Sequence, residues 1–215
     1  MNKENNLDNV KSYLKEISKE YKTGIAKEHA YRPHLKDLIE SFDSRLIAVN
    51  DPKRVDCGAV DFSVRSDELP IGYIETKDIW VSLDESENSE QIQRYLKALH
   101  NFVLTNYLEF RWYVDGELRK TALLAKKFGN SKIEPVAQGS IDAFALLDEF
   151  LNQEPEKIIN ASHLSSRLAY IAREIKEVVI KSFKSNKASQ QIRDLRSAIS
   201  DVLISDICLP EKTGE

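Results

Sequence analysis

Two carboxylates and an ammonium group occupy neighbouring segments in the first half of this sequence. Asp61 precedes the tripeptide Glu75-Thr76-Lys77, and the apolar residues around both positions predict that each lies on a strand. A hard cation such as Mg²⁺ takes oxygen ligands, usually one or two carboxylates together with phosphate oxygens and water. These residues therefore indicate the chemistry of a metal-dependent phosphodiesterase, which holds a metal and a water beside a phosphate.

Strand geometry would bring the acidic and basic side chains to one place. We predict two adjacent strands, at residues 59–65 and 71–77, joined by a short polar link. Because side chains alternate between the two faces of a strand, Glu75 and Lys77 would share a face. Glu-x-Lys pairs are also common on ordinary protein surfaces, so the prediction depends on Asp61 on the neighbouring strand.

A helix predicted for residues 86–100 follows the second of these strands. Gln91 and Tyr95 are about one turn apart on it, so their side chains would share a face. Such a pair is a weak signal by itself. It becomes more specific here because it follows Asp61 and Glu75 in the chain and lies on the expected type of element.

Four segments carry a resemblance to a known family. They are Glu28-His29-Ala30-Tyr31-Arg32-Pro33, Gly58-Ala59-Val60-Asp61-Phe62, Gly72-Tyr73-Ile74-Glu75-Thr76-Lys77 and Gln91-Ile92-Gln93-Arg94-Tyr95. Together they resemble the amino-terminal nuclease domain of single-chain restriction-modification enzymes, the Type ISP and Type IIG class. The nuclease of that class is of the PD-(D/E)xK kind with an additional Gln-x-x-x-Tyr motif. The resemblance is strongest between Thr23 and Gly116.

The resemblance implies a Mg²⁺ site in which Mn²⁺ can substitute. Asp61 and Glu75 would supply carboxylate ligands, and the main-chain carbonyl of Thr76 would supply a third oxygen. Lys77 would hold or deprotonate the attacking water and offset the negative charge on the phosphate. Val60 stands where the family has Pro. Since that Pro supplies backbone shape and no ligand, the departure leaves the expected ligands unchanged.

Further residues of these segments are candidates for supporting roles. Glu28 would reach a second metal or a metal-bound water, although the helix dipole alone also favours an acidic residue at a helix start. Of Gln91 and Tyr95, one would orient the water or the lysine, and the other would contact the DNA backbone or fix the helix. Arg32 and Arg94 are either phosphate contacts or surface residues.

We expect an α/β fold: a restriction-endonuclease-like core with a mixed central β-sheet flanked by helices, followed by a C-terminal helical extension. The expected division is a nuclease core at residues 1–135 and a helical extension or linker at 136–215, leading toward a methyltransferase domain. Two long helices, at 162–185 and 188–207, would form most of the extension. Residues 209–215 are typical of an interdomain linker, so we expect the chain to be part of a longer protein.

The first part of the chain alternates between helical and strand patterns. Apolar residues at helical spacing predict two helices before the first strand, and period-two patterns predict the strands. Residues 129–132 are expected to form only a loop. The other expected elements are helices at 7–21, from near 27 and from 140, and strands at 46–49, 102–107, 110–114 and 118–124.

The expected partners also follow from the resemblance. The substrate would be double-stranded DNA, cut in phage defence, and methyltransferase and target-recognition domains would belong to the same polypeptide. Because a double-strand break needs two active sites, we expect transient pairing of nuclease domains. The net charge of −4 argues against DNA binding as the main role of this part. Residues 167–196 hold eight Lys or Arg and three acidic residues. This basic segment is either a solvated helix face or a contact with DNA or with another domain.

Composition argues against several other classes of protein. The first residues are polar, so we expect no signal peptide, and no apolar stretch approaches the roughly 20 residues needed to span a bilayer. Cys57 and Cys208 are far apart in the chain, which argues against a disulfide scaffold or a zinc site. We therefore expect a cytoplasmic protein without a membrane partner.

Two alternatives to a DNA endonuclease stay open at this point. One is a catalytically inactive module of nuclease fold that binds DNA or docks a methyltransferase. The acidic net charge favours this alternative, whereas the complete set of Asp61, Glu75, Lys77 and Gln91 opposes it. The other is a nuclease that acts on RNA or on damaged DNA.

Overall fold

The structure is a computed structural model, and it describes residues 3–52, 58–66, 69–129 and 132–153. Side chains are described from Asn6 onward. Farther along, single residues in helical conformation are described, namely Ser165, Leu168, Ala169, Ala172, Lys176 and Ile180.

The chain forms two compact units, Met1–Glu156 and Lys157–Glu215. The second unit contains the single helical residues named above. The helices predicted at 162–185 and 188–207, and with them the basic segment at 167–196, fall on this unit. Apart from those single residues, these predictions lie outside the described residues.

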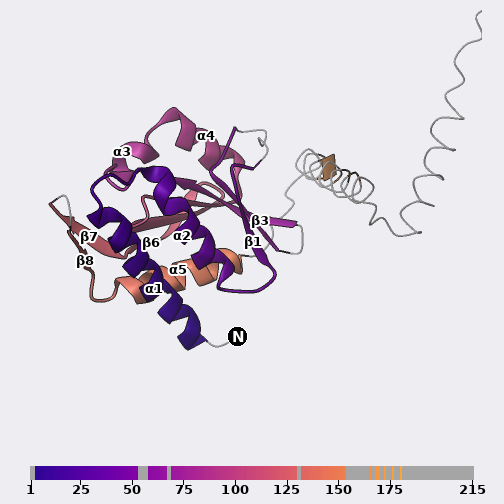
Figure 1. The fold of residues 1–215 in the computed structure, drawn as a ribbon. Helices are drawn as coiled ribbons and strands as arrows, with labels where there is room; N and C mark the ends of the chain where they lie inside the picture. Colours follow the sequence, from indigo (N-terminus) through magenta and orange to yellow (C-terminus); the bar gives the residue numbers. More distant parts are fainter. Residues whose placement is uncertain are drawn as a thin grey trace, which may run out of the picture. The chain divides into compact units, whose positions relative to one another are not determined.

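A six-stranded sheet forms the centre of the first unit (Figure 1). In the order in which they pair, its strands are β1 (Leu46–Asn50), β2 (Phe62–Ser66), β3 (Leu69–Thr76), β4 (Asn101–Thr105), β5 (Glu109–Val114) and β6 (Glu117–Leu123). β3 and β4 pair in parallel, and the other neighbours pair antiparallel. The sheet is therefore mixed, as the sequence predicted.

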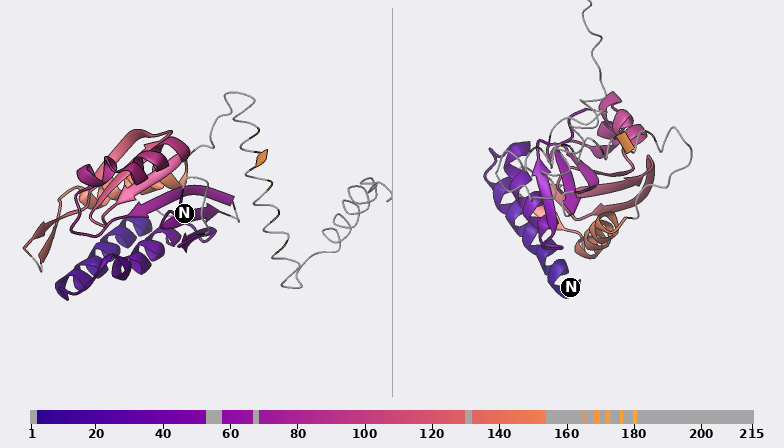
Figure 2. Two further views of the ribbon diagram at one scale, coloured as in Figure 1. Left: turned by 90° about the horizontal axis from the view of Figure 1, so that it is seen from above. Right: turned by 90° about the vertical axis from the view of Figure 1, so that its right-hand side faces the viewer.

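Helices cover both faces of this sheet (Figure 2). On one face lie α1 (Lys3–Lys22), α2 (Glu28–Glu40) and α5 (Gly139–Leu151), and on the other lie α3 (Leu83–Glu87) and α4 (Glu90–Ala98). The buried residues of β4 alternate between the two resulting cores. Val103 belongs to the core that includes α1, α2 and α5, whereas Phe102 and Leu104 belong to the core under α4.

The spacing of apolar residues explains how the first helix is placed. Val10, Leu14, Ile17 and Tyr21 recur every three or four residues along α1, and all four are buried. The predicted helix at 7–21 is confirmed and extends a few residues farther at its start. Its apolar stripe packs against the same core as that of α2, which follows in sequence.

The helix predicted at 86–100 is wrong as a single element, because the structure has two helices there, α3 and α4. The break falls at Asn88 and Ser89. Ser89 has extended backbone angles, and its hydroxyl accepts a hydrogen bond from the main-chain N–H of Ile92 at 3.3 Å. A serine in this position is a favoured helix N-cap, so it starts a new helix instead of continuing the old one.

A second, two-stranded sheet was not predicted. Its strands are β7 (Ala125–Phe128) and β8 (Lys132–Pro135), which pair antiparallel, so the predicted loop at 129–132 is wrong at Lys132, the first residue of β8. The strands are short, and Ala125 and Ile133 are their buried hydrophobic residues. An alternation this brief is too weak to identify a strand from the sequence.

Helix α5 belongs to the first unit, although it lies beyond residue 135, where we expected the core to end. Its buried side chains belong to the core on the α1 side of the sheet, and they are Ala143, Leu146, Leu147 and Phe150. The Asn101 side chain ties the end of α5 to the sheet, because its Nδ2 donates to the carbonyl oxygens of Phe150 at 2.9 Å and Ile71 at 2.8 Å. The compact unit therefore extends past the expected boundary, to Glu156.

Close packing of α5 on β3 requires a glycine. A Cβ built on Gly72 would lie 2.5 Å from the ring of Phe150 and 2.9 Å from Asn101 Nδ2. Contacts this short force neighbouring atoms to move. Gly72, which is part of the segment that resembles the nuclease family, thus allows the helix to approach the strand that carries Glu75.

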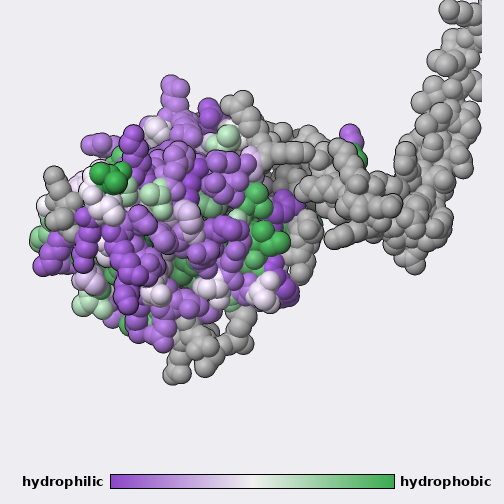
Figure 3. Space-filling model, in the orientation of Figure 1, coloured by the Kyte–Doolittle hydropathy of each residue, from purple (hydrophilic) through white to green (hydrophobic). Residues whose placement is uncertain are grey.

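The face of the first unit that Figure 3 shows is mainly hydrophilic, with hydrophobic side chains gathered near β1 and β3. Ile47, Val49 and Leu69 are the large exposed hydrophobic residues of these strands. Among the helices that the structure describes, none is long and apolar enough to cross a lipid bilayer.

The role of α5 in the core can be tested with two phenylalanines. Phe150 is fully buried, whereas Phe128 on β7 is 51% exposed. We expect Phe150→Ala to reduce the free energy of unfolding by about 3–5 kcal/mol. Phe128→Ala should change it by roughly 0.5 kcal/mol or less. Urea denaturation followed by circular dichroism measures both, and equal effects would contradict the placement of α5 in the core.

Candidate functional site

Asp61 lies where the chain enters β2, beside the end of β3. The antiparallel register pairs Phe62 with Ile74, so the residue before β2 meets the last residues of β3. Asp61 Oδ2 accepts hydrogen bonds from the main-chain N–H of Thr76 at 2.8 Å and from its hydroxyl at 2.7 Å. Strand pairing and these two bonds together hold the first carboxylate next to the Glu-x-Lys segment.

Glu75, Lys77 and Gln91 form one hydrogen-bonded cluster. Lys77 Nζ donates to Glu75 Oε1 at 2.8 Å and to Gln91 Oε1 at 3.2 Å. Gln91 Nε2 donates in turn to Glu75 Oε1 at 3.0 Å. Glu75 and Lys77 thus lie on the same side of the strand, as alternation predicts, and α4 brings Gln91 to them.

Tyr95 lies behind this cluster, with 1% of its surface exposed. Its hydroxyl donates to the carbonyl oxygen of Ala59 at 2.5 Å and accepts from Gln91 Nε2 at 3.2 Å. Its ring lies against Gly58, where an added Cβ would come within 3.3 Å of it. These contacts favour a role in fixing α4 to the segment before Asp61, since a buried hydroxyl does not reach a substrate backbone.

Glu75 is a buried carboxylate, 3% exposed, whose charge is only partly balanced. Burial raises its pKa to about 7, the charge of Asp61 adds to the increase, and the bond from Lys77 opposes it. Glu75 Oε1 receives the bonds described above, but Oε2 is buried without a hydrogen-bond partner among the residues that the structure describes. Because an unpaired buried oxygen is energetically costly, this atom is suited to a cation.

Arg32 joins the carboxylates of the site from α2. Its Nη2 donates to Glu28 Oε1 at 2.8 Å and to Asp61 Oδ1 at 2.5 Å. Its Nη1 donates to Asp51 Oδ1 at 3.1 Å and to Asn50 Oδ1 at 3.3 Å. Arg32 was expected to be a phosphate contact or a surface residue. With 6% of its surface exposed, it is neither. Its Nη donors are instead directed at three carboxylates and one amide of the protein itself, and its Nε is buried without a hydrogen-bond partner among the described residues.

Two further contacts were missed by the sequence analysis. The Thr76 hydroxyl lies 3.3 Å from Glu28 Oε1 in addition to its bond with Asp61, so its side chain also belongs to the site. The hydroxyl of Tyr107 donates to the main-chain carbonyl of Glu28 at 2.9 Å and fixes the start of α2. The i, i+4 spacing of Glu28 and Arg32 was a signal for their ion pair. The Tyr107 contact joins distant parts of the chain and has no local signal.

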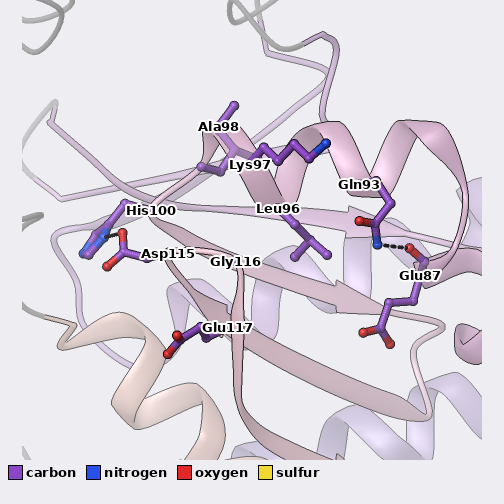
Figure 4. A pocket seen from close by; sticks show the side chains of 10 residues that line it. Glu87, Gln93, Leu96, Lys97, Ala98, His100, Asp115, Gly116 and Glu117 are labelled. Carbon is purple, nitrogen blue, oxygen red and sulfur yellow. Dashed lines mark hydrogen bonds and ion pairs between the residues drawn. The ribbon is translucent and has the colours of Figure 1, made fainter. Parts of the chain in front are cut away.

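A surface pocket lies at the other end of α4 (Figure 4). Gln91 and Tyr95 are on the first turns of this helix, whereas the pocket is formed where the helix ends and by the β5–β6 turn. His100 and Asp115 face each other in it, with Nδ1 and Oδ1 2.7 Å apart. The pocket is therefore distinct from the carboxylate cluster. Exposed Arg94, on α4, stays a candidate for phosphate contact.

Comparison with known proteins identifies the fold. No protein-family model matches the chain, and no curated protein matches it. Among solved structures, the chain is similar to one determined by cryo-electron microscopy, a complex of DrdV with DNA. The TM-score is 0.55 with 18% sequence identity, over 69% of this chain and 99% of that chain. The fold is restriction-endonuclease-like.

The donor atoms of this site fit the hard cation that the resemblance implies. Glu75 Oε2 is a buried oxygen in need of a partner, and Asp61 is close enough to raise the pKa of Glu75. Within the described part of the chain, no group of three or more His, Cys, Asp or Glu side chains is placed to hold a metal. Besides carboxylates, main-chain oxygen, water and substrate oxygens are the ligands that such a cation would take.

The unbalanced charge of Glu75 predicts an effect of pH on stability. Its folded pKa of about 7 lies above the ordinary value of 4.5, so the stabilisation from protonation is present below pH 4.5 and is lost as the pH rises through 7. We expect Glu75→Gln to stabilise the metal-free protein at pH 8 by about 1–3 kcal/mol, a few degrees in melting temperature. The amide keeps an oxygen that can accept from Lys77 and Gln91.

Thermal unfolding in EDTA at pH 5 and pH 8 measures this effect. The gain from Glu75→Gln should shrink at pH 5, where the wild-type carboxyl is mostly protonated. Glu134→Gln, at a partly exposed carboxylate on β8, is the control and should show no comparable dependence. If Glu75→Gln were less stable than the wild type by the same amount at pH 5 and at pH 8, the interpretation that the charge of Glu75 is unbalanced would be contradicted.

Proposed function

We propose that this chain is a Mg²⁺-dependent DNA endonuclease, acting as the nuclease domain of a single-chain restriction-modification enzyme. Mn²⁺ is expected to substitute for Mg²⁺. The observation that carries the proposal is the hydrogen-bonded cluster of Glu75, Lys77 and Gln91 beside Asp61, in which Glu75 Oε2 has no hydrogen-bond partner among the described residues. In this proposal the site hydrolyses a phosphodiester by in-line attack of water.

Each polar group of the cluster has a distinct role in this reaction. When bound by Asp61, Glu75 and the main-chain carbonyl of Thr76, the metal would act as a Lewis acid toward the phosphate and its water. Lys77, held by Glu75 and Gln91, would orient the attacking water as an ammonium group, or accept a proton from it as the neutral amine. Its positive charge also opposes the charge that develops on the phosphate.

DNA as the substrate is supported by two independent lines. The fold resembles that of DrdV, whose structure was determined in a complex with DNA. The motif segments resemble nuclease domains of restriction-modification enzymes. The net charge of −4 suggests that methyltransferase and target-recognition domains of the same polypeptide provide much of the DNA affinity. Two such nuclease domains would pair transiently to cut both strands.

A second candidate function is a catalytically inactive module that binds DNA or docks another domain. One observation favours it, namely that both oxygens of Asp61 already accept hydrogen bonds, from Arg32 and from Thr76. Each carboxylate oxygen has two lone pairs. Oδ2 uses both for the two bonds from Thr76, whereas Oδ1 accepts one bond, from Arg32, so Oδ1 is the oxygen that leaves a place for a metal. Loss of metal binding in Asp61→Ala would separate the endonuclease from the inactive module.

Nicking of supercoiled plasmid in Mg²⁺ or Mn²⁺ tests the proposed activity. We expect Lys77→Ala and Asp61→Ala to reduce the nicking rate by at least about 10²-fold, the effect of removing one electrostatic group from an active site. EDTA should abolish nicking by the wild type. Lys120→Ala is a matched control, because Lys120 also pairs with a glutamate, Glu149, at 2.5 Å, but outside the site.

Circular dichroism must show that each variant is folded. Near wild-type nicking by folded Lys77→Ala would remove the site assignment. Nicking that RNA inhibits more strongly than DNA does would instead favour a ribonuclease. If the wild type neither nicks nor binds a divalent ion, the inactive module is the better description.

A further inference from the structure

One nitrogen of Arg32 bridges two carboxylates of the site. Nη2 lies 2.8 Å from Glu28 Oε1 and 2.5 Å from Asp61 Oδ1. Sites that cleave phosphodiesters with two metals hold the ions about 3.5–4 Å apart. Glu28 is the residue from which we expected a contact with a second metal. In the structure, the space between Glu28 and Asp61 is taken by a guanidinium group.

This guanidinium is a permanent part of the site. Its Nη1 is held by Asp51 and Asn50, its Nε is buried without a hydrogen-bond partner among the described residues, and the residue is 6% exposed. Because arginine keeps its proton at all accessible pH values, the positive charge stays in place.

The negative charges of the site are therefore balanced unequally. Glu28 and Asp61 share Arg32, and the Thr76 hydroxyl lies within hydrogen-bond distance of both. Glu75 has one oxygen bonded to Lys77 and Gln91, and its other oxygen is buried without a partner among the described residues. A divalent ion would be stabilised more beside Glu75 than between Glu28 and Asp61, because the positive charge of Arg32 already lies between those two carboxylates and would repel it.

We infer that Arg32 is a built-in cation that takes the place of a second metal between Glu28 and Asp61, so that the site binds one divalent ion, beside Glu75. The inference rests on the proposed function, because it concerns the metal of the same site. Arg32 is then a positioning residue. It holds the Asp61 carboxylate in place for the ion, and Glu28 supports Arg32 and does not ligate a metal.

Arg111 provides a matched control in the same chain. It also pairs with three carboxylates, those of Asp84 at 2.5 Å, Glu87 at 2.6 Å and Glu109 at 2.7 Å, and its side chain is 13% exposed. These residues lie on α3 and β5 and are separate from the predicted ligands. Replacing Arg111 thus leaves three carboxylates unpaired, as replacing Arg32 does, without touching the metal site.

The number of bound ions tests the inference directly. Mn²⁺ is titrated into the whole chain without DNA, and free Mn²⁺ is followed by electron paramagnetic resonance. We expect one ion per chain in the wild type, Arg111→Gln and Glu28→Gln, and no ion in Asp61→Ala. Arg32→Lys, which keeps a cation, should also bind one ion, with affinity reduced by about 10- to 100-fold. Arg32→Gln should bind two, because Glu28 and Asp61, whose side chains are only 29% and 16% exposed, then lack their cation, whereas Asp84 beside Arg111 is 82% exposed and is solvated by water.

Three results would overturn the inference. Two ions in the wild type with one in Glu28→Gln would show that Glu28 ligates a second metal. One ion in Arg32→Gln, with a wild-type circular dichroism spectrum, would show that the guanidinium does not exclude an ion. No ion in the wild type would contradict the proposed function itself, which distinguishes that failure from the other two. If Arg32→Gln does not fold, the number of ions bound by the wild type, Arg32→Lys and Glu28→Gln still tests the inference.

Discussion

The pairing of β3 with β2 on one side and with β4 on the other is the constraint on which the site depends. The antiparallel register brings Asp61 to the end of β3, and the parallel register holds Glu75 opposite Leu104. A parallel neighbour requires a crossover connection, and here the crossover contains α4, which carries Gln91. A shift of one residue in β3 would turn Glu75 to the opposite face and separate it from Gln91.

Buried charge is the second constraint on this unit. Glu75 and Arg32 are both almost fully buried. The charge of Arg32 is balanced by the carboxylates of Glu28, Asp51 and Asp61, although its Nε is buried without a partner among the described residues. Glu75 pairs with Lys77 and lies near the like charge of Asp61. The balance around Glu75 is incomplete, and its raised pKa reflects this. An unsatisfied buried carboxylate lowers the stability of the metal-free protein, and such a loss of stability is common at functional sites.

Periodicity in the sequence was sufficient for the six-stranded sheet and for helices α1, α2 and α5. Strong apolar stripes, such as that of α1, and alternating strands are local patterns, and tertiary packing agrees with them. The prediction was wrong where the local signal was weak or ambiguous. The break at Ser89 depends on one capping hydrogen bond, and β7 and β8 are too short to show alternation. Helix α5 was recognised as a helix, but the sequence did not show that Phe150 packs against Gly72.

The sequence by itself determined which groups are available, namely two carboxylates, a lysine and a glutamine, in an order and on elements that suit metal-dependent hydrolysis. Only the tertiary structure decided how their charges are shared. It turned Arg32 inward to bridge Glu28 and Asp61, buried Tyr95 against Ala59, and left Glu75 Oε2 without a partner among the described residues. Spacing along the chain reports which neighbours share a face of one element. Ion pairs between elements depend on packing across the whole core, which no local pattern records.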